Sequence, residues 1–578
     1  MMSGFRVLLQ QALGRGYLKL LAALSLTTTL AACNAAANPT PATSAPAVRR
    51  RTEGPAPSRS ELLRGEYGRY RANNDLLYYH LDVRLDPDKR FLSGKTTIRF
   101  RMLSDDNRIQ IDLHQALNVD RILLAGAPLK YTREERAVFI DFPQTLRKGS
   151  TYSIEFHYSG TPAETGRGGG GGGGGGVTFR KDANGKHFIN TVCEGTGSST
   201  WWPSKDQWTD EVESADISIA VPNGLTDVSN GSFVGKRDLG DGYTRWDWAV
   251  HYPINSYNVS MNVGDYAHFT DTYKDMTLNF YVLTDSLPKA RAQFSQAKGM
   301  LAAYEHYFGE YPFKKDGYKL VEATNAGMEH QSAVTYGNGF KNGYGGRDWT
   351  GVGISPRFDF IIIHESGHEW FGNAISAADR SDMWIHEGWT TYLENLYVEY
   401  TYGYADALKY VNGYKTKVQN REPIIPPGGL MRTPPQDMYF KGALMLNTLR
   451  SVVNDDTRWF KLLHDLFQHF KYQNIATDQL VQYFNQQTGK NLTPIFDQYL
   501  RHTALPTLEL KFDDAAGTVA YRWQADEPAF AMPVRVGRKD AWQIIQPTTV
   551  EWKTMRSPLK KDAFEVATDL YFVDVTKQ

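Results

Sequence analysis

The sequence DFIIIHESGHEWFGNAISAADRSDMWIHEGW fills residues 359–389 and holds the polar groups around which the chain is organised. An apolar run at 360–363 leads into His364, Glu365 and His368, which predicts a buried helix with a few polar groups at a cleft. His364 and His368 are four residues apart, so they lie on one helical face. Two imidazoles at this spacing can hold one zinc ion, with Glu365 beside them as a base.

A catalytic zinc site needs a third protein ligand and keeps a fourth position for water. Residues 383–400 are expected to form a second long helix, and Glu387 lies one turn from its start. We therefore predict that two adjacent helices bring His364, His368 and Glu387 together around a single zinc ion. Such a site acidifies water and polarises a carbonyl group.

An HExxH pattern also occurs by chance on helices, so by itself it leaves open a structure without metal. The block WIHEGW at 384–389 favours the metal site. HESGHEWFGN, with eighteen residues between its second histidine and the glutamate of WIHEGW, resembles the aminopeptidase N family of zinc metallopeptidases. The flanking residues that also fit the family pattern are Trp370, Phe371, Gly372, Asn373 and Asp382.

Composition narrows the class of protein. Of the 578 residues, 41% are hydrophobic and 22% are charged, as in globular proteins. Lys+Arg and Asp+Glu both number 64, so no basic excess favours nucleic acid as a partner. The two cysteines are Cys33 and Cys193, and if Cys33 carries a lipid on its sulfur, as the amino terminus implies below, no internal disulfide can form.

The amino terminus has the layout of a secretory signal. Basic residues precede the apolar stretch 20–30, and the sequence LAAC at 30–33 resembles a bacterial lipobox. The resemblance implies cleavage before Cys33, lipidation of Cys33 and anchoring in the bacterial cell envelope, at the outer membrane because Asn34 follows. The alternative is an ordinary secretory signal in which Cys33 is incidental. No other apolar run is long enough to span a bilayer.

The remaining sequence predicts a multidomain α+β protein. Residues 1–33 are the lipoprotein signal, and the Ala-, Pro- and Ser-rich segment 34–65 reads as a disordered tether. Alternating strands predict a β domain over 66–265, and strands return in a small β-sandwich over 504–578. The resemblance implies an antiparallel saddle for the first of these and a thermolysin-like α/β catalytic domain over 266–503. The glycine run 168–176 lacks the Lys-Ser/Thr ending of a phosphate-binding loop and reads as a flexible hairpin tip.

Two further segments resemble the substrate-binding parts of the family. Glu194, in VCEG, occupies the place of a glutamate or glutamine that reaches the active site from the β domain. Gly327, Met328 and Glu329 match the GxMEN signature, which implies that Glu329 is the second carboxylate holding a substrate's α-ammonium. Gly327 and Met328 would then lie along the substrate backbone.

The GxMEN match is incomplete. Ala326 replaces a glycine and His330 replaces the asparagine. His330 could be a neutral hydrogen-bonding substitute or a protonated charge beside Glu329. These departures leave the subsite geometry open.

The segment YFKGA at 439–443 resembles the family's YxKGA, whose tyrosine points at the zinc. The resemblance implies that Tyr439 donates a hydrogen bond to the oxyanion, which is typically worth about 10²–10³ in rate.

The sequence thus predicts a zinc aminopeptidase that acts on peptides with a free amino terminus. Glu365 would act as general base on a zinc-bound water and pass the proton to the leaving amine. A lipid-anchored zinc protein that binds peptides or partners without cleaving them is the alternative. An endopeptidase would leave Glu194 and Glu329 unexplained. The preferred first residue and the oligomeric state are not encoded in any motif.

Overall fold

The computed structural model describes residues 56–164 and 175–578. The lipobox with Cys33, residues 34–55 and most of the glycine run lie outside this part of the chain. The predicted tether extends to residue 65, but Arg59–Gly65 forms a helix, α1. Ser58 caps it by accepting a hydrogen bond from Glu61 N at 3.2 Å. The folded chain therefore begins earlier than its composition indicates.

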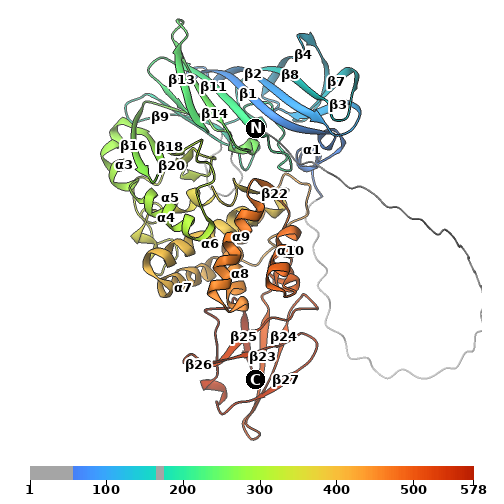
Figure 1. Cartoon of the computed structure of the whole chain (residues 1–578), viewed down its shortest axis with the longest axis vertical. Coiled ribbons are helices and arrows are strands. Elements are labelled where there is room, and N and C mark those ends of the chain that lie inside the picture. The colour runs from blue at the N-terminus through green and yellow to red at the C-terminus, as the bar shows by residue number, and fades with distance from the viewer. Residues whose placement is uncertain (1–55, 165–174) are drawn as a thin grey trace, which may run out of the picture. The chain divides into compact units, whose positions relative to one another are not determined.

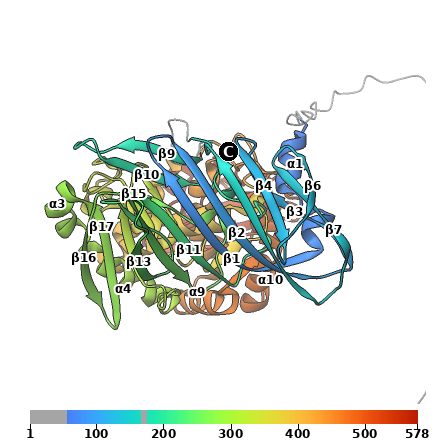
Figure 2. The ribbon, with the colours of Figure 1, turned by 90° about the horizontal axis from the view of Figure 1, so that it is seen from above.

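Three β-sheets and a short second helix, α2 (Arg69–Ala72), make up the region up to residue 264. The largest sheet has the order β13-β14-β11-β1-β2-β8-β4-β5 and is antiparallel except where β1 pairs with β11 (Figure 2). Its strands are β1 (Asn74–Asp86), β2 (Phe91–Met102), β4 (Leu117–Leu124), β5 (Ala127–Pro128), β8 (Thr151–Gly160), β11 (Ser214–Pro222), β13 (Ser232–Asp238) and β14 (Tyr243–Val250). A second sheet contains β3 (Asp106–Asp112), β6 (Lys130–Glu134) and β7 (Ala137–Leu146). A third contains β9 (Gly176–Lys181), β10 (His187–Val192), β12 (Thr226–Val228) and β15 (Asn262–Gly264).

The alternation in β1 explains how this region folds. Leu81, Val83 and Leu85 are at most 1% exposed, whereas Asp82 and Arg84 between them are partly exposed. One face of the strand therefore enters the core, as the period of two predicts.

A mixed five-stranded sheet and a set of helices follow (Figure 1). The sheet order is β16-β17-β18-β20-β19, with bounds Tyr266–Tyr273, Met276–Leu283, Tyr318–Glu322, Val334–Tyr336 and Gly327–Met328. The helices are α3 (Leu287–Gln293), α4 (Gln296–Phe308), α5 (Phe360–Gly367), α6 (Trp384–Tyr402), α7 (Tyr404–Gly413), α8 (Asp437–Val453), α9 (Asp456–Phe470), α10 (Thr477–Thr488) and α11 (Thr493–Arg501). A two-stranded pair, β21 (Ile375–Ala377) and β22 (Gln473–Ile475), joins the α5–α6 connection to the segment after α9. Helix α6 contacts α4, α5, α7 and α8, so it is the central helix of this region.

The last part of the chain forms two small sheets. One contains β27, β24, β23 and β29 (Lys553–Arg556, Thr518–Gln524, Thr507–Asp513 and Asp574–Lys577). The other contains β26, β25 and β28 (Ala541–Ile545, Val534–Arg538 and Glu565–Val566). Tyr499 of α11 donates a hydrogen bond to the carbonyl of Phe572 at 2.7 Å, which ties this β unit to the helices. The predicted α+β class, with β-rich first and last parts, is confirmed. None of the helices described here has the length and apolarity needed to cross a membrane.

Candidate active site

Helix α5 supplies the first pair of polar groups. Asp359 caps it by accepting hydrogen bonds from the backbone N–H groups of Ile361 and Ile362 at 3.1 and 3.4 Å. The helix ends at Gly367, and His368 is its C-cap residue with φ −61° and ψ −19°. Because this conformation is still helical, His364 and His368 keep the same-face relationship that their spacing predicts.

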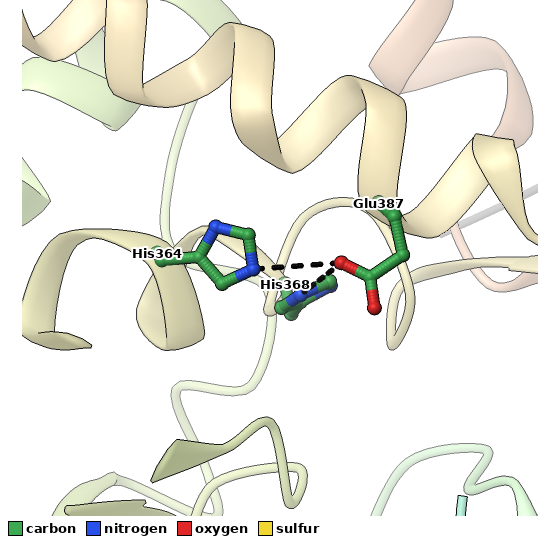
Figure 3. A group of neighbouring side chains, drawn as sticks. All are labelled: His364, His368 and Glu387. Carbon is green, nitrogen blue, oxygen red and sulfur yellow. Dashed lines mark ion pairs between the residues drawn. The ribbon is translucent and has the colours of Figure 1, made fainter. Parts of the chain in front are cut away.

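Helix α6 brings Glu387 to the two histidines. Glu387 Oε2 lies 3.4 Å from His364 Nε2 and 3.3 Å from His368 Nε2, and the three side chains point toward one another (Figure 3). All three residues are less than 10% exposed. Glu387 Oε2 has no hydrogen-bond partner among the described residues. Two imidazole nitrogens and a carboxylate oxygen left without a partner are the donor set of a catalytic zinc ion, so these residues fit that metal.

The outer nitrogen of each histidine is already engaged. His364 Nδ1 lies 2.7 Å from Glu394 Oε1, and His368 Nδ1 lies 3.0 Å from the carbonyl oxygen of Phe371. Both acceptors favour a proton on Nδ1, which leaves the Nε2 lone pairs directed at the centre of the site. Glu394 is itself held by hydrogen bonds from the hydroxyl groups of Tyr410 and Tyr414.

Glu365 lies beside this cluster. A carboxylate oxygen of Glu365 falls within 4.8 Å of ligand atoms of Glu329 and His368. Burial raises the pKa of Glu365, while the two histidines oppose the increase. Gly327 sits directly against it, because a Cβ atom at residue 327 would lie 2.5 Å from Glu365 Oε1.

Glu194 and Glu329 form a second acidic pair in the same cavity. Their carboxylate oxygens and a ring nitrogen of His386 lie within 4.8 Å of one another. Glu194 Oε1 has no hydrogen-bond partner among the described residues, and Tyr257 donates to Glu329 Oε1 at 3.1 Å. Burial and the negative charge of Glu387 raise the pKa of Glu194 to about 8. Such a pair is suited to a cationic group.

Asn373 links the segment that carries Glu329 to the β-rich first region. It donates a hydrogen bond to the carbonyl of Glu329 at 2.8 Å and accepts one from Asn258 at 2.8 Å. Asn258 belongs to the β-rich first region, whereas Glu329 follows β19. This contact fixes the two regions against each other next to the site.

The two departures from the GxMEN signature have different consequences. His330 is fully buried, and neither of its ring nitrogens has a hydrogen-bond partner in the described part of the chain. Burial lowers its pKa to about 3, so the ring is neutral and adds no charge beside Glu329. Ala326 lines the cavity and accepts a hydrogen bond from Gly337 N at 2.8 Å.

Tyr439 lies in the first turn of α8, and its hydroxyl group donates to Glu387 Oε1 at 2.7 Å. Its ring also stacks near His364, with 6.1 Å between the centroids. The phenol is therefore placed at the predicted metal site, where its partner is the carboxylate of a proposed ligand.

One cavity of about 200 Å³ contains all the predicted site residues except Cys33. Its acidic end is formed by Glu194 and Glu329. Around His364 it carries an aromatic group that consists of Tyr344, Trp349, Phe360 and Phe440. Metal-binding, acidic and apolar groups therefore line one space, as in an enzyme site that orients a polar substrate.

Three features of this cavity have no counterpart among the predicted residues. Glu394 could have been predicted to lie near the site, because it follows Glu387 by seven residues and so shares its face of α6. Arg380 precedes α6 without any motif. The aromatic group combines three residues from 344–360 with Phe440 of α8, which no motif links.

Comparisons with known proteins agree with this arrangement. A family model described as the peptidase family M1 domain matches residues 292–499, and one described as the peptidase M1 N-terminal domain matches 76–258. Endoplasmic reticulum aminopeptidase 1 of Rattus norvegicus is 22% identical over 432 residues, covering 70% of this chain and 45% of the relative. Aminopeptidase B of Rattus norvegicus is 23% identical over 521 residues, covering 78% and 74%. This chain spans about half the length of the endoplasmic reticulum aminopeptidases that it matches.

Solved structures share the fold. The M1 zinc metallopeptidase from Deinococcus radiodurans has a TM-score of 0.63 and 20% identity, over 75% of this chain and 94% of that chain. A variant of it bound to a Tyr-Ser-Ala substrate has a TM-score of 0.61 and 20% identity, over 75% of this chain and 96% of that chain.

Proposed function

Because this chain belongs to the M1 family of zinc metallopeptidases, we propose that it is a zinc aminopeptidase that removes the first residue from peptides. The observation that carries the proposal is a single cavity in which His364, His368 and Glu387 converge beside the buried pair Glu194 and Glu329. Peptide cleavage at a metal site requires only the metal-binding residues. The buried acidic pair is needed in addition to bind a substrate with a free α-ammonium group.

Zinc held by His364, His368 and Glu387 would supply Lewis-acid polarisation of the scissile carbonyl and acidification of the attacking water. Glu365 accepts the proton of that water and passes it to the leaving amine. Its raised pKa, caused by burial, brings it closer to the pH at which a carboxylate both takes and returns a proton.

Tyr439 is the donor for the oxygen that gains negative charge in the reaction. Its hydroxyl group donates to Glu387 in the structure, so it would exchange that acceptor for the substrate oxygen.

Glu194 and Glu329 bind the α-ammonium group and fix the cut one residue from the amino terminus. Two buried carboxylates without a cation repel each other, and a bound ammonium relieves the repulsion. An acetylated amino terminus carries no positive charge, so the repulsion between Glu194 and Glu329 remains. Discrimination against blocked peptides follows from this difference.

The test compares aminoacyl-nitroanilides with free and acetylated amino termini on the purified, zinc-loaded protein. We expect turnover only of the free substrates. Equal rates on both would refute the exopeptidase assignment. Glu365→Gln should retain one equivalent of zinc and lose most turnover, whereas a catalytically silent peptide-binding protein would show no turnover to lose.

We also propose, from the lipobox alone, that Cys33 carries the lipid that anchors the protein to the bacterial envelope. Fractionation of cells that express the full chain or Cys33→Ser tests this. The wild type should sediment with membranes and the variant should not. Equal partitioning of the two would reject the anchor.

A further inference from the structure

Arg380 is a buried cation at the acidic end of the cavity. It lies in the short 3₁₀ turn Arg380–Asp382 before α6 and is 5% exposed. One terminal nitrogen donates to the backbone carbonyl of Glu194, and the other donates to Thr433 Oγ1 at 3.0 Å. The guanidinium also lies over the ring of Trp208, 5.0 Å from its centroid. These contacts fix its position beside one of the proposed ammonium-binding residues.

Arg380 differs from the other buried arginines of the described chain in having no carboxylate within ion-pair distance. Four arginines of the described chain are less than 10% exposed, and three of them form ion pairs. These pairs are Arg64 with Asp206, Arg71 with Asp112, and Arg450 with Glu399. Within the described residues no carboxylate forms an ion pair with Arg380, and its Nε has no hydrogen-bond partner. The negative charges of Glu194 and Glu329 act on Arg380 from beyond ion-pair distance. Buried charges are normally paired in direct contact, so a guanidinium that lines a cavity without such a contact is suited to an anion that enters the cavity.

The position of Arg380 restricts which part of a substrate that anion can belong to. A peptide whose α-ammonium lies between Glu194 and Glu329 carries the side chain of its first residue on the adjacent carbon atom. Because Arg380 donates a hydrogen bond to the carbonyl of Glu194, it lies at this end of the cavity. The aromatic group instead meets the metal site, where Phe360 stacks on His364. The guanidinium fork matches a carboxylate in shape as well as charge.

We propose that Arg380 binds the side-chain carboxylate of the first residue, so that the enzyme prefers peptides that begin with glutamate or aspartate. The inference rests on the proposed function for the placement of the ammonium group. Thr433 orients the guanidinium, and the ammonium held by Glu194 and Glu329 removes the repulsion that these carboxylates would otherwise exert on an acidic side chain.

The test uses two isosteric pairs, Glu- against Gln-nitroanilide and Asp- against Asn-nitroanilide, on the zinc-loaded protein. We expect kcat/KM to favour the acidic member roughly 10- to 100-fold, the range of a charge-assisted hydrogen bond. Arg380→Gln should remove this preference, so that kcat/KM becomes equal within each pair, chiefly through loss of rate on the acidic member. Arg380→Lys, which keeps the charge without the fork, should retain part of the preference. Arg432→Gln is the matched control, because Arg432 precedes Thr433, pairs with Glu61 and does not line the cavity.

A binding measurement separates this inference from the proposed function. Titration calorimetry of free L-glutamate and L-glutamine on the zinc-loaded protein needs no turnover. Tighter binding of glutamate that is lost in Arg380→Gln supports the inference even if no nitroanilide is cleaved. Equal binding and equal kcat/KM for the acidic and neutral members would overturn it. It would also be overturned if Arg380→Gln weakened both members equally, because Arg380 would then act only as a countercharge to Glu194.

Discussion

Gly327 and Glu365 are in contact across the cavity, so closely that a Cβ atom at residue 327 would lie 2.5 Å from Glu365 Oε1. The edge strand β19 therefore sets the position of the proposed general base. A glycine at the variable second position of the GxMEN signature is required here for space, because its neighbour is the base itself.

Gly327→Ala should displace Glu365 and lower kcat by about 10² while zinc remains bound, since general acid–base catalysis is worth that much and depends on position. Steady-state kinetics and zinc content of the purified variant measure both. Gly299→Ala in α4 is the control, because a Cβ there meets nothing within 4 Å. An unchanged kcat in Gly327→Ala would show that catalysis does not depend on the position that Gly327 gives to the Glu365 side chain.

Glu394→Gln should weaken zinc binding about 10- to 100-fold, because Glu394 orients His364 through Nδ1 at 2.7 Å and increases its basicity. Competition with a chromogenic chelator gives the zinc affinity. Glu399→Gln changes a carboxylate on the same helix that pairs with Arg450 instead, and it should leave the affinity unaltered. Equal affinities in the two variants would remove Glu394 from the positioning role.

His330 should make the fold sensitive to acid. Burial lowers its pKa from 6.5 to about 3, so between these values the unfolded chain binds a proton that the folded chain does not. Stability is therefore lost as the pH falls below 6.5, by up to about 1.4 kcal/mol per pH unit.

Replacing His330 with asparagine, the residue of the family signature, should reduce this loss. Urea unfolding of the metal-free wild type and His330→Asn at pH 7.5 and pH 4.5 should differ by roughly 2–3 kcal/mol in how much stability each loses. Metal-free protein is used so that release of zinc from its histidines does not contribute. An identical loss in both proteins would mean that His330 gains a proton without unfolding.

The aromatic group should bind the residue after the cut. Trp349 packs near Phe360 and Phe440, with centroid distances of 5.8 and 6.3 Å, and the ammonium of Lys417 lies 3.6 Å from its ring centroid. Trp349→Ala should raise KM for Ala-Phe-amide about tenfold, the effect of losing one apolar contact surface, and change KM for Ala-Ala-amide little. A KM that rises equally for both dipeptide amides would place the second residue elsewhere.

The metal cluster could be predicted because its information is local. Histidine spacing within one turn and the position of Glu387 near the start of the next helix describe geometry that two packed helices reproduce. Glu194 and Glu329 lie in segments whose meeting depends on how the first β region packs against β19. Only the resemblance to a family located them.

Other parts of the site depend on burial, which a motif does not state. His330 had two interpretations in sequence, and its complete enclosure makes it neutral and without a hydrogen-bond partner among the described residues. Arg380 stands in a segment of ordinary charged residues, where it reads as a solvated side chain. Its significance arises from three-dimensional packing that buries it beside Glu194 without a carboxylate in direct contact. The helix α1 was hidden for a related reason, because the Pro- and Ala-rich composition before it dominates the segment.

The pairing of Glu194 from one region with Glu329 from the other, fastened through Asn258 and Asn373, limits how the chain can be rearranged. A chimera that joins this catalytic region to the β region of a relative would keep the metal-binding residues and Glu329. It would lose Glu194, the other residue proposed to bind the peptide's amino terminus. Substrate choice in such hybrids therefore depends on the interface between the two regions. A functional exchange would have to transfer the interface residues of both regions.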